Sequence, residues 1–182
     1  MVDTHLTHPT YKIVEEKDAD AFAWIFTDPK GGPKKTPIKF PELKPTELRA
    51  KVTYTGLCHS DIHTVRGDWG PCAYPMAPGH EIVGVVTHLG SDVKDFKVGD
   101  RVGFGTQRNA CGDCDPCHEN SEQICEKGDH IYTFGDKYWG GYCSALQQPA
   151  DFFFKLPEGL PEDKIPPLFC AGITTYNPVA RW

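Results

Sequence analysis

The chain has 182 residues, a formal net charge of −6 and a pI near 5.7. Its surplus of acidic groups argues against nucleic-acid binding, which needs a basic face, and no apolar run approaches the roughly 20 residues of a membrane span. The hydrophobic share of 39% predicts a globular protein of one ordinary domain with a core of its own.

The N-terminal segment, residues 1–20, is polar and predicts a loose arm with a short extended piece. Its first residues have neither the basic region nor the apolar region of a secretory signal. We therefore expect a cytoplasmic protein, in which thiols stay reduced.

Several short strands follow the arm. The clearest is the stretch from Leu48 to Tyr54, where apolar and polar residues alternate as in a half-buried strand. The predicted strands are residues 21–26, 48–54, 82–87, 101–104, 142–146 and 152–156. Helical signals are few, and they fall at residues 60–65, at 162–169 and from Ala171 onward. This pattern predicts a mainly β fold, with short strands spaced as in a barrel.

The strongest motif is a run of closely spaced cysteines. Cys111 and Cys114 are separated by two residues, Cys117 follows after two more, and Cys125 comes eight positions later. Two intervening residues let a tight turn direct successive thiolates at one point, and zinc takes four such ligands at tetrahedral corners. Four thiolates leave no open position, so such a site stabilises a loop. The spacing predicts a structural zinc lobe over about residues 108–128.

Two alternatives to zinc stay open on spacing alone. The 8 cysteines are an even number, as in a disulfide framework, although a chain without a secretory signal disfavours disulfides. Ferredoxin-like iron–sulfur clusters also use a Cys-x₂-Cys-x₂-Cys run.

A second group of metal-binding residue types is spread over residues 58–63, residues 79–81 and Cys170. A catalytic zinc keeps three protein ligands and one open position, and two cysteines with one histidine are a known set. Cys58, His80 and Cys170 supply that set. Spacing does not pair ligands so distant in sequence, so ordinary structural roles for these residues stay open.

Polar neighbours of this second group suggest further roles. Asp61 and Glu81 are able to orient His80 or to tune the charge of a metal. Ser60 is suited to accept the proton of a bound alcohol, and His63 to carry it to water.

Residues 56–61 together with residues 79–84, Gly-His-Glu-Ile-Val-Gly, resemble zinc-dependent alcohol dehydrogenases of the medium-chain superfamily. The run of cysteines stands where that family places its structural zinc. The stretches at residues 59–63, 66–70 and 169–176 are similar to the cinnamyl alcohol dehydrogenase branch. The match runs from about Ala21 to the end of the chain, and it implies a GroES-like, partly open β-barrel with a structural zinc lobe and a few short helices.

The resemblance also implies a role for each residue singled out. The catalytic zinc would be held by Cys58, His80 and Cys170, with Glu81 as a nearby ligand. The structural zinc would be held by Cys111, Cys114, Cys117 and Cys125. Ser60 and His63 would form the proton relay, Asp61 would support His80, His59 would contact the cofactor pyrophosphate, and Trp69 would line the substrate pocket. Cys72 and Cys143 match no ligand position and are expected to be ordinary cysteines.

The activity implied is the interconversion of primary alcohols and aldehydes with NADP(H) or NAD(H), with two zinc ions per chain. Members of the family are homodimers that act on small alcohols or aldehydes. Neither nucleic acid nor membrane is an expected partner.

The sequence departs from the family in one respect. No Gly-x-Gly-x-x-Gly follows a strand, so the Rossmann domain that binds the dinucleotide is expected to be absent. Residues 21–170 would form the catalytic domain, and residues 171–182 would begin a helix leading to a missing cofactor domain. Two hypotheses follow: part of an alcohol dehydrogenase that needs a further segment or partner chain and is inactive alone, or a non-catalytic zinc-bound β-domain acting as a structural or interaction module.

Overall fold

The computed structural model describes residues 11–72, 74–127 and 139–181. Residues 1–10 of the expected arm, residue 128 of the expected lobe and Trp182 lie outside the described residues. The strands are β1 (Lys12–Ile13), β2 (Ala21–Ile25), β3 (Lys34–Lys39), β4 (Glu47–Thr55), β5 (Ile82–Leu89), β6 (Arg101–Phe104), β7 (Ala145–Pro149) and β8 (Phe153–Lys155). The α-helices are α1 (His59–Arg66), α2 (Asp115–His118) and α3 (Ala171–Arg181). Short 3₁₀ helices cover Glu16–Asp18, Glu122–Ile124, Ala150–Phe152, Glu162–Lys164 and Pro166–Phe169.

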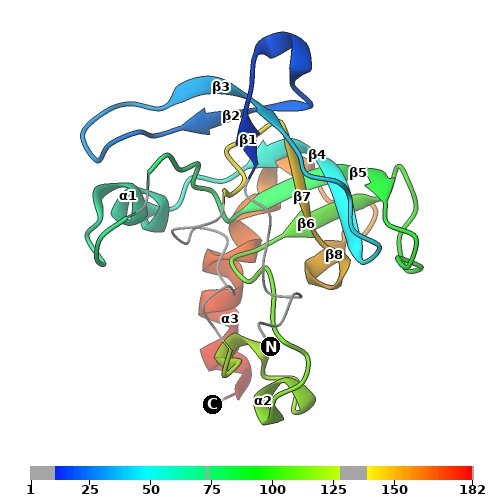
Figure 1. Ribbon diagram of the computed structural model, residues 1–182. Helices are drawn as coiled ribbons and strands as arrows, with labels where there is room; N and C mark the ends of the chain where they lie inside the picture. Colours follow the sequence, from blue (N-terminus) through cyan, green and yellow to red (C-terminus); the bar gives the residue numbers. More distant parts are fainter. Residues whose placement is uncertain (1–10, 73, 128–138, 182) are drawn as a thin grey trace.

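The strands form two sheets that make a partly open barrel (Figure 1). The larger sheet has five strands in the order β7-β4-β5-β6-β8, and the smaller has three in the order β1-β3-β2. The small sheet lies across one end of the curled large sheet, and the bridge between Ala23 and Cys143 links β2 to the approach of β7. All strand pairs within the described ranges are antiparallel, so this part of the chain contains no parallel β-α-β unit. The mainly β fold with a partly open barrel expected from the sequence is confirmed.

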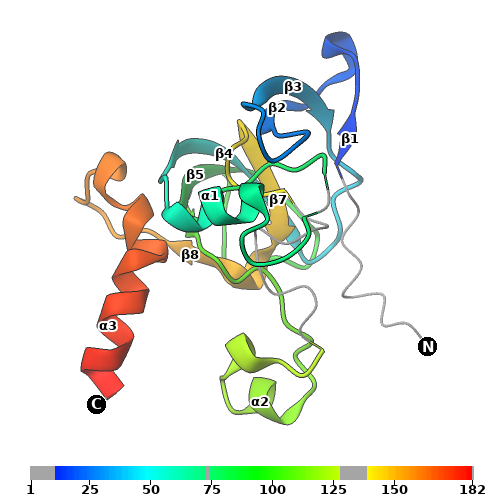
Figure 2. The ribbon, with the colours of Figure 1, turned by 90° about the vertical axis from the view of Figure 1, so that its left-hand side faces the viewer.

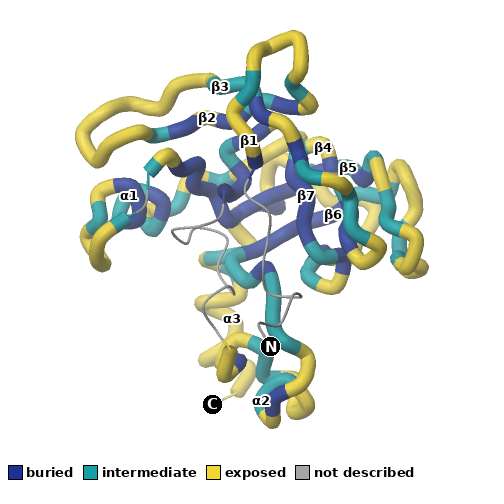
Figure 3. Tube along the Cα trace, in the orientation of Figure 1, coloured by how far each residue is buried: buried dark blue, intermediate teal, exposed yellow. Residues whose placement is uncertain are grey.

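The core lies between the two sheets (Figure 3). The predicted alternation holds in the first half of β4, where Leu48 and Ala50 are buried and Lys51 is exposed, but it fails at Tyr54, which is 45% exposed. Apolar side chains from both sheets meet there, and Ile38, Phe104 and Leu146 are fully buried. Burial of such side chains is the main stabilising contribution to a barrel of this size.

Three predicted elements differ from the structure. Residues 142–144 precede β7 instead of belonging to it, because the backbone of Tyr142 bonds to Pro78 and Trp24. The predicted helix at 162–169 is two 3₁₀ helices, since the consecutive prolines at 166 and 167 have no N–H to donate. Strand β3 was not predicted, because its lysines and Pro37 hide the apolar pattern.

The described part of the expected arm packs onto the barrel. β1 pairs with β3, and Tyr11 lies in the core against Phe40 and Trp139. The Tyr11 hydroxyl donates to the carbonyl oxygen of Gln147 (2.9 Å) and accepts from its N–H (3.1 Å). Tyr11 thereby joins the N-terminal segment to β7.

Two parts of the chain stand away from the barrel. One is the cysteine-rich segment with α2, and the other is α3, which has no buried residue and projects from the sheets (Figure 2). Among the described helices, none combines the length and apolar character needed to cross a membrane.

Candidate metal centres and active site

The first cluster is built where β4 ends and α1 begins. Cys58 has an extended conformation and caps α1, and its N–H donates to the carboxylate of Asp61 at 3.1 Å. This reciprocal cap between the residue before the helix and the third residue within it is a common helix start. The helix ends at Gly67, whose φ of 71° is a left-handed conformation suited to glycine. The local sequence thus places Ser60 and Asp61 in the first turn beside the Cys58 thiol.

Long-range folding brings three more potential ligands to Cys58. The ligand atoms of Cys58, His80, Glu81 and Cys170 all lie within 4.8 Å of one another. His80 and Glu81 precede β5, and Cys170 stands between the last 3₁₀ helix and α3. Thiolates held about 2.3 Å from a tetrahedral zinc lie about 3.8 Å apart, and the Cys58 and Cys170 sulfurs are 3.9 Å apart. The donor set and its spacing fit a zinc ion.

Glu81 adds a buried carboxylate to this cluster. Its side chain fits because residue 56 is glycine: a Cβ at Gly56 would stand 1.9 Å from Glu81 Oε2. Burial raises the pKa of Glu81 above its ordinary value, and the negative charge of Asp61 adds to this. A cation in the cluster would favour the charged form of Glu81.

Asp61 holds several parts of the cluster in place. It is only 2% exposed. Its Oδ1 accepts from the N–H of Gly79 (2.9 Å) and from Nδ1 of His80 (3.0 Å). Its Oδ2 accepts from the N–H of Cys58 and from the hydroxyl of Tyr142 (3.0 Å). The sequence suggested the contact with His80, whereas Tyr142 carried no signal that sequence reasoning used.

The contact with Asp61 sets the state of the His80 ring. A carboxylate accepts only, so Nδ1 carries the proton and Nε2 becomes the ligand atom. Burial opposes charge on the ring, but the hydrogen bond and charge of Asp61, with smaller contributions from Cys58, raise the pKa of His80 above its ordinary value. The neutral ring, held in this tautomer, is the form that binds metals.

Ser60 and His63 lie on α1 beside the cluster. Burial opposes ionisation of the Cys58 thiol, but hydrogen bonds from Ser60, followed by those from His80 and Cys170, lower its pKa below the ordinary value. The Ser60 side chain therefore touches the metal-binding group. His63 lies toward the solvent, where its Nδ1 is 2.8 Å from Oδ2 of Asp68, a residue for which the sequence predicted no role.

Three aromatic rings, two on α1 and one just after it, follow one another, and each contacts the next. The rings of His59 and His63 are 4.5 Å apart, and those of His63 and Trp69 are 5.1 Å apart. Trp69 is 60% exposed. His63 thus lies between His59, the expected cofactor contact, and Trp69, the expected wall of the substrate pocket.

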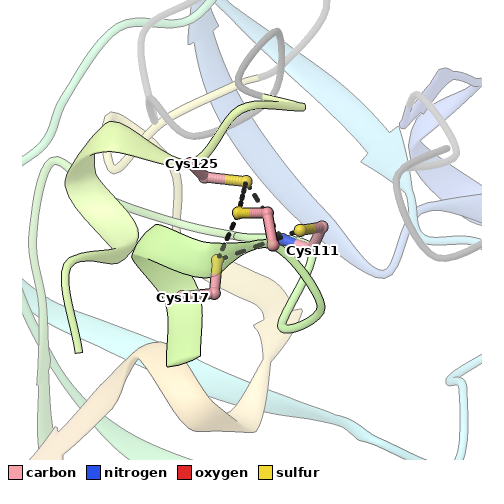
Figure 4. A group of neighbouring side chains, drawn as sticks. Cys111, Cys117 and Cys125 are labelled. Atoms are coloured by element: carbon pink, nitrogen blue, oxygen red, sulfur yellow. Dashed lines mark hydrogen bonds between the residues drawn. The ribbon is translucent and has the colours of Figure 1, made fainter. Parts of the chain in front are cut away.

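The second cluster is the four-cysteine lobe (Figure 4). Its sulfur–sulfur distances include 3.9 Å between Cys111 and Cys117, 3.4 Å between Cys114 and Cys117 and 4.0 Å between Cys114 and Cys125. These values bracket the spacing of about 3.8 Å expected around a tetrahedral zinc. Among the residues that the structure describes, the lobe's apolar cluster consists of these cysteines and Ala110. With so little apolar material to bury, the lobe fits a segment that a metal holds together.

The pKa values of the neighbouring Cys114 and Cys117 thiols shift in opposite directions. A hydrogen bond from the backbone of Glu126, with further bonds from Cys117 and Cys111, lowers the pKa of Cys114 to about 7. Burial and the neighbouring Cys114 raise the pKa of Cys117 to about 12. Neighbouring thiolates repel one another, and a bound cation relieves that repulsion.

The two remaining cysteines stand apart from both clusters. Cys143 is buried, and its thiol donates to the carbonyl oxygen of Gly140 at 3.2 Å. Cys72 is half-buried, and its thiol donates to the carbonyl oxygen of Thr64 at 2.8 Å.

Comparisons with known proteins show the family to which the chain belongs. Residues 44–158 match the alcohol dehydrogenase GroES-like domain. The chain is 40% identical over 165 residues to probable cinnamyl alcohol dehydrogenase 2 of Nicotiana tabacum, covering 88% of this chain and 46% of that protein. It is 42% identical over 154 residues to NADP-dependent alcohol dehydrogenase C 1 of Mycolicibacterium smegmatis, covering 81% of this chain and 44% of that protein.

Solved structures show the same relationship. The crystal structure of CAD from Helicobacter pylori complexed with NADP(H) superposes with a TM-score of 0.82 at 34% identity, covering 88% of this chain and 48% of that one. The chain spans about half the length of the curated relatives it matches. From the domain match, the identities and the superposition together, we conclude that the chain belongs to the zinc-dependent medium-chain alcohol dehydrogenases and resembles their cinnamyl alcohol dehydrogenase branch.

Proposed function

We propose that this chain forms the zinc-binding catalytic part of a dehydrogenase that interconverts primary alcohols and aldehydes with NADP(H). The observation that carries the proposal is the convergence of the Cys58, His80, Glu81 and Cys170 ligand atoms beside Ser60. NADP(H) is preferred to NAD(H) because one relative is named NADP-dependent and a solved relative is complexed with NADP(H).

Two zinc ions have separate tasks in this proposal. Cys58, His80 and Cys170 bind the catalytic ion, with Glu81 as a nearby ligand. Cys111, Cys114, Cys117 and Cys125 bind the structural ion. The catalytic zinc, when bound, acts as a Lewis acid on the alcohol or aldehyde oxygen. The support is the chemistry of the donor sets, since three ligands leave an open position and four thiolates leave none.

The remaining residues bind and move protons. The Ser60 hydroxyl takes the proton of the alcohol, and His63 passes it to water, supported by the hydrogen bond to Asp68. Asp61 keeps His80 in the tautomer that binds the metal. His59 contacts the cofactor pyrophosphate, and Trp69 forms one wall of the substrate site. Residues 21–170 are the proposed catalytic domain, with the lobe at about 108–128.

The proposal predicts the effect of removing one hydroxyl. In the full-length protein that the gene encodes, Ser60→Ala should lower the rate of aldehyde reduction with NADPH by about 10²–10⁴-fold, the usual contribution of a positioned acid or base. Zinc content, measured by mass spectrometry of metals, should stay at two ions per chain. Ser91→Ala is the matched control, because Ser91 is exposed, its hydroxyl donates to its neighbour Asp92, and it lies outside the metal cluster.

The outcomes separate the two hypotheses. Wild-type protein with two zinc ions and no turnover of any primary alcohol or aldehyde supports a non-catalytic zinc-bound domain and contradicts the proposal. Iron with labile sulfide in the lobe contradicts the assignment of structural zinc. Full activity of Ser60→Ala contradicts the proton path alone.

A further inference from the structure

Tyr142 connects the loop before β7 to the metal cluster although it offers no ligand. Its hydroxyl donates to Oδ2 of Asp61 at 3.0 Å, while Oδ1 of the same carboxylate accepts from His80. We propose that Tyr142 is a positioning residue of the catalytic metal site, which acts on His80 and Cys58 through Asp61. This inference rests on the proposed function, and it assigns that site a further residue.

Asp61 needs Tyr142 because both of its oxygens are occupied by donors from separate segments. Oδ2 receives the N–H of Cys58 and the hydroxyl of Tyr142, and Oδ1 receives the N–H of Gly79 and Nδ1 of His80. Asp61 is 2% exposed, so no bulk water replaces a lost donor. Removing the Tyr142 hydroxyl leaves Oδ2 with the Cys58 N–H alone and lets the carboxylate rotate about its last bond. Such a rotation would misalign His80.

The backbone holds Tyr142 at a fixed distance from Asp61. Its N–H donates to Pro78 (2.9 Å) and its carbonyl oxygen accepts from Trp24 (2.7 Å). A Cβ at Gly140 would stand 2.1 Å from the carbonyl oxygen of Gly79, and Gly79 itself has a φ of +112°. The segment before Tyr142 is thus in direct backbone contact with the segment that precedes His80. The tyrosine hydroxyl and the His80 ring therefore approach Asp61 from one rigid unit.

The charges around the phenol keep it in the donating form. Burial, followed by the charge and hydrogen bond of Asp61, raises the pKa of Tyr142 well above its ordinary value, and Glu81 and Cys58 act in the same direction. The hydroxyl therefore holds its proton at neutral pH, and the interaction with Asp61 is a charge-assisted hydrogen bond.

The test measures how firmly each zinc ion is held. A chromophoric chelator is added to the zinc-loaded chain, and zinc release is followed over time. Two kinetic phases are expected, one for each zinc ion. The phase that is missing in Cys58→Ser belongs to the catalytic site. Tyr142→Phe keeps the ring and should speed zinc release from the catalytic site by about tenfold, the lower end of the effect of outer partners on metal affinity. The lobe's zinc, in the same molecule, should be released at an unchanged rate.

Tyr11→Phe is the matched control. It also removes a buried phenol hydroxyl, but one that bonds Gln147 on β7 and not the metal cluster. It should destabilise the fold and leave both release phases unchanged. A similar acceleration in Tyr11→Phe would mean that general loosening releases the metal, and it would overturn the inference.

A double-mutant cycle separates positioning from packing. Asp61→Asn keeps the shape of the side chain but replaces one acceptor oxygen by a donor, so it should by itself accelerate zinc release from the catalytic site. If Tyr142→Phe does not fold, this variant still tests whether Asp61 positions the metal ligands. In the Asp61→Asn background, Tyr142→Phe should add nothing. A full additional effect would show that Tyr142 acts independently of Asp61, and an unchanged rate in the single Tyr142→Phe variant would equally overturn the inference. If the wild-type chain lacks the phase assigned to Cys58, the proposed function fails as well.

Discussion

The buried thiol of Cys143 titrates differently in the folded and unfolded chain. Burial raises its pKa from 9.0 to about 12. Above pH 9 the unfolded chain therefore releases a proton that the folded chain keeps. Unfolding becomes more favourable with rising pH, and the contribution of this group to stability is complete below pH 9 and is lost progressively toward pH 12.

This titration predicts a pH-dependent difference between wild type and Cys143→Ala. The free energy of unfolding, measured in urea from pH 8 to 11, should fall more steeply in wild type, by up to about 1.4 kcal/mol per pH unit above pH 9. Other titrating groups are shared by both proteins and cancel in the difference. A gap that stays constant over this range would show that the Cys143 thiol ionises normally in the fold.

Among the elements, β7 depends on a residue from the other end of the chain. The Tyr11 hydroxyl satisfies both backbone groups of Gln147, which is fully buried, so Tyr11→Phe leaves an N–H and a C=O without this partner. We expect a loss of about 1–3 kcal/mol in the free energy of unfolding. Tyr54→Phe on β4 is the control, since Tyr54 is 45% exposed and should change stability by less than about 0.5 kcal/mol. Equal free energies of unfolding for the two variants would contradict this role of the Tyr11 hydroxyl.

At the scale of the whole molecule, the lobe and the barrel are stabilised by separate means. In the described part of the chain, the barrel has one large apolar cluster, whereas the lobe's cluster consists of cysteines and Ala110. Cys114→Ser should therefore unfold the lobe and leave the barrel folded, because metal binding in such segments supplies folding free energy of about 10 kcal/mol in small zinc peptides.

Hydrogen exchange is the measurement for this variant. Amides of residues 111–125 should exchange rapidly, while those of β4 and β5 remain protected. Addition of a chelator to the wild-type chain should give the same pattern. Cooperative loss of protection in β4 together with the lobe would show that the two parts fold as one unit.

Local patterns in the sequence were enough to predict several features correctly. The alternation in the first half of β4 and the turn residues around β5 and β6 depend on neighbours in the chain, so these three strands were predicted to within a few residues. The four cysteines of the lobe lie within 15 positions, from Cys111 to Cys125, and their spacing alone indicated a shared site. The cap formed by Cys58 and Asp61 is equally local.

The remaining features depend on contacts between distant residues. Cys170 meets Cys58 across 112 positions and Tyr142 meets Asp61 across 81, and no spacing rule connects such pairs. The resemblance to a family suggested the first pair, but only the folded chain revealed the second. The composition of β3, with its lysines, does not predict a strand. Its pairing with β1 and β2 makes it one, and that pairing appears only in the folded chain. The motifs thus identify the chemistry, and the packing of the two sheets determines which side chains share a site.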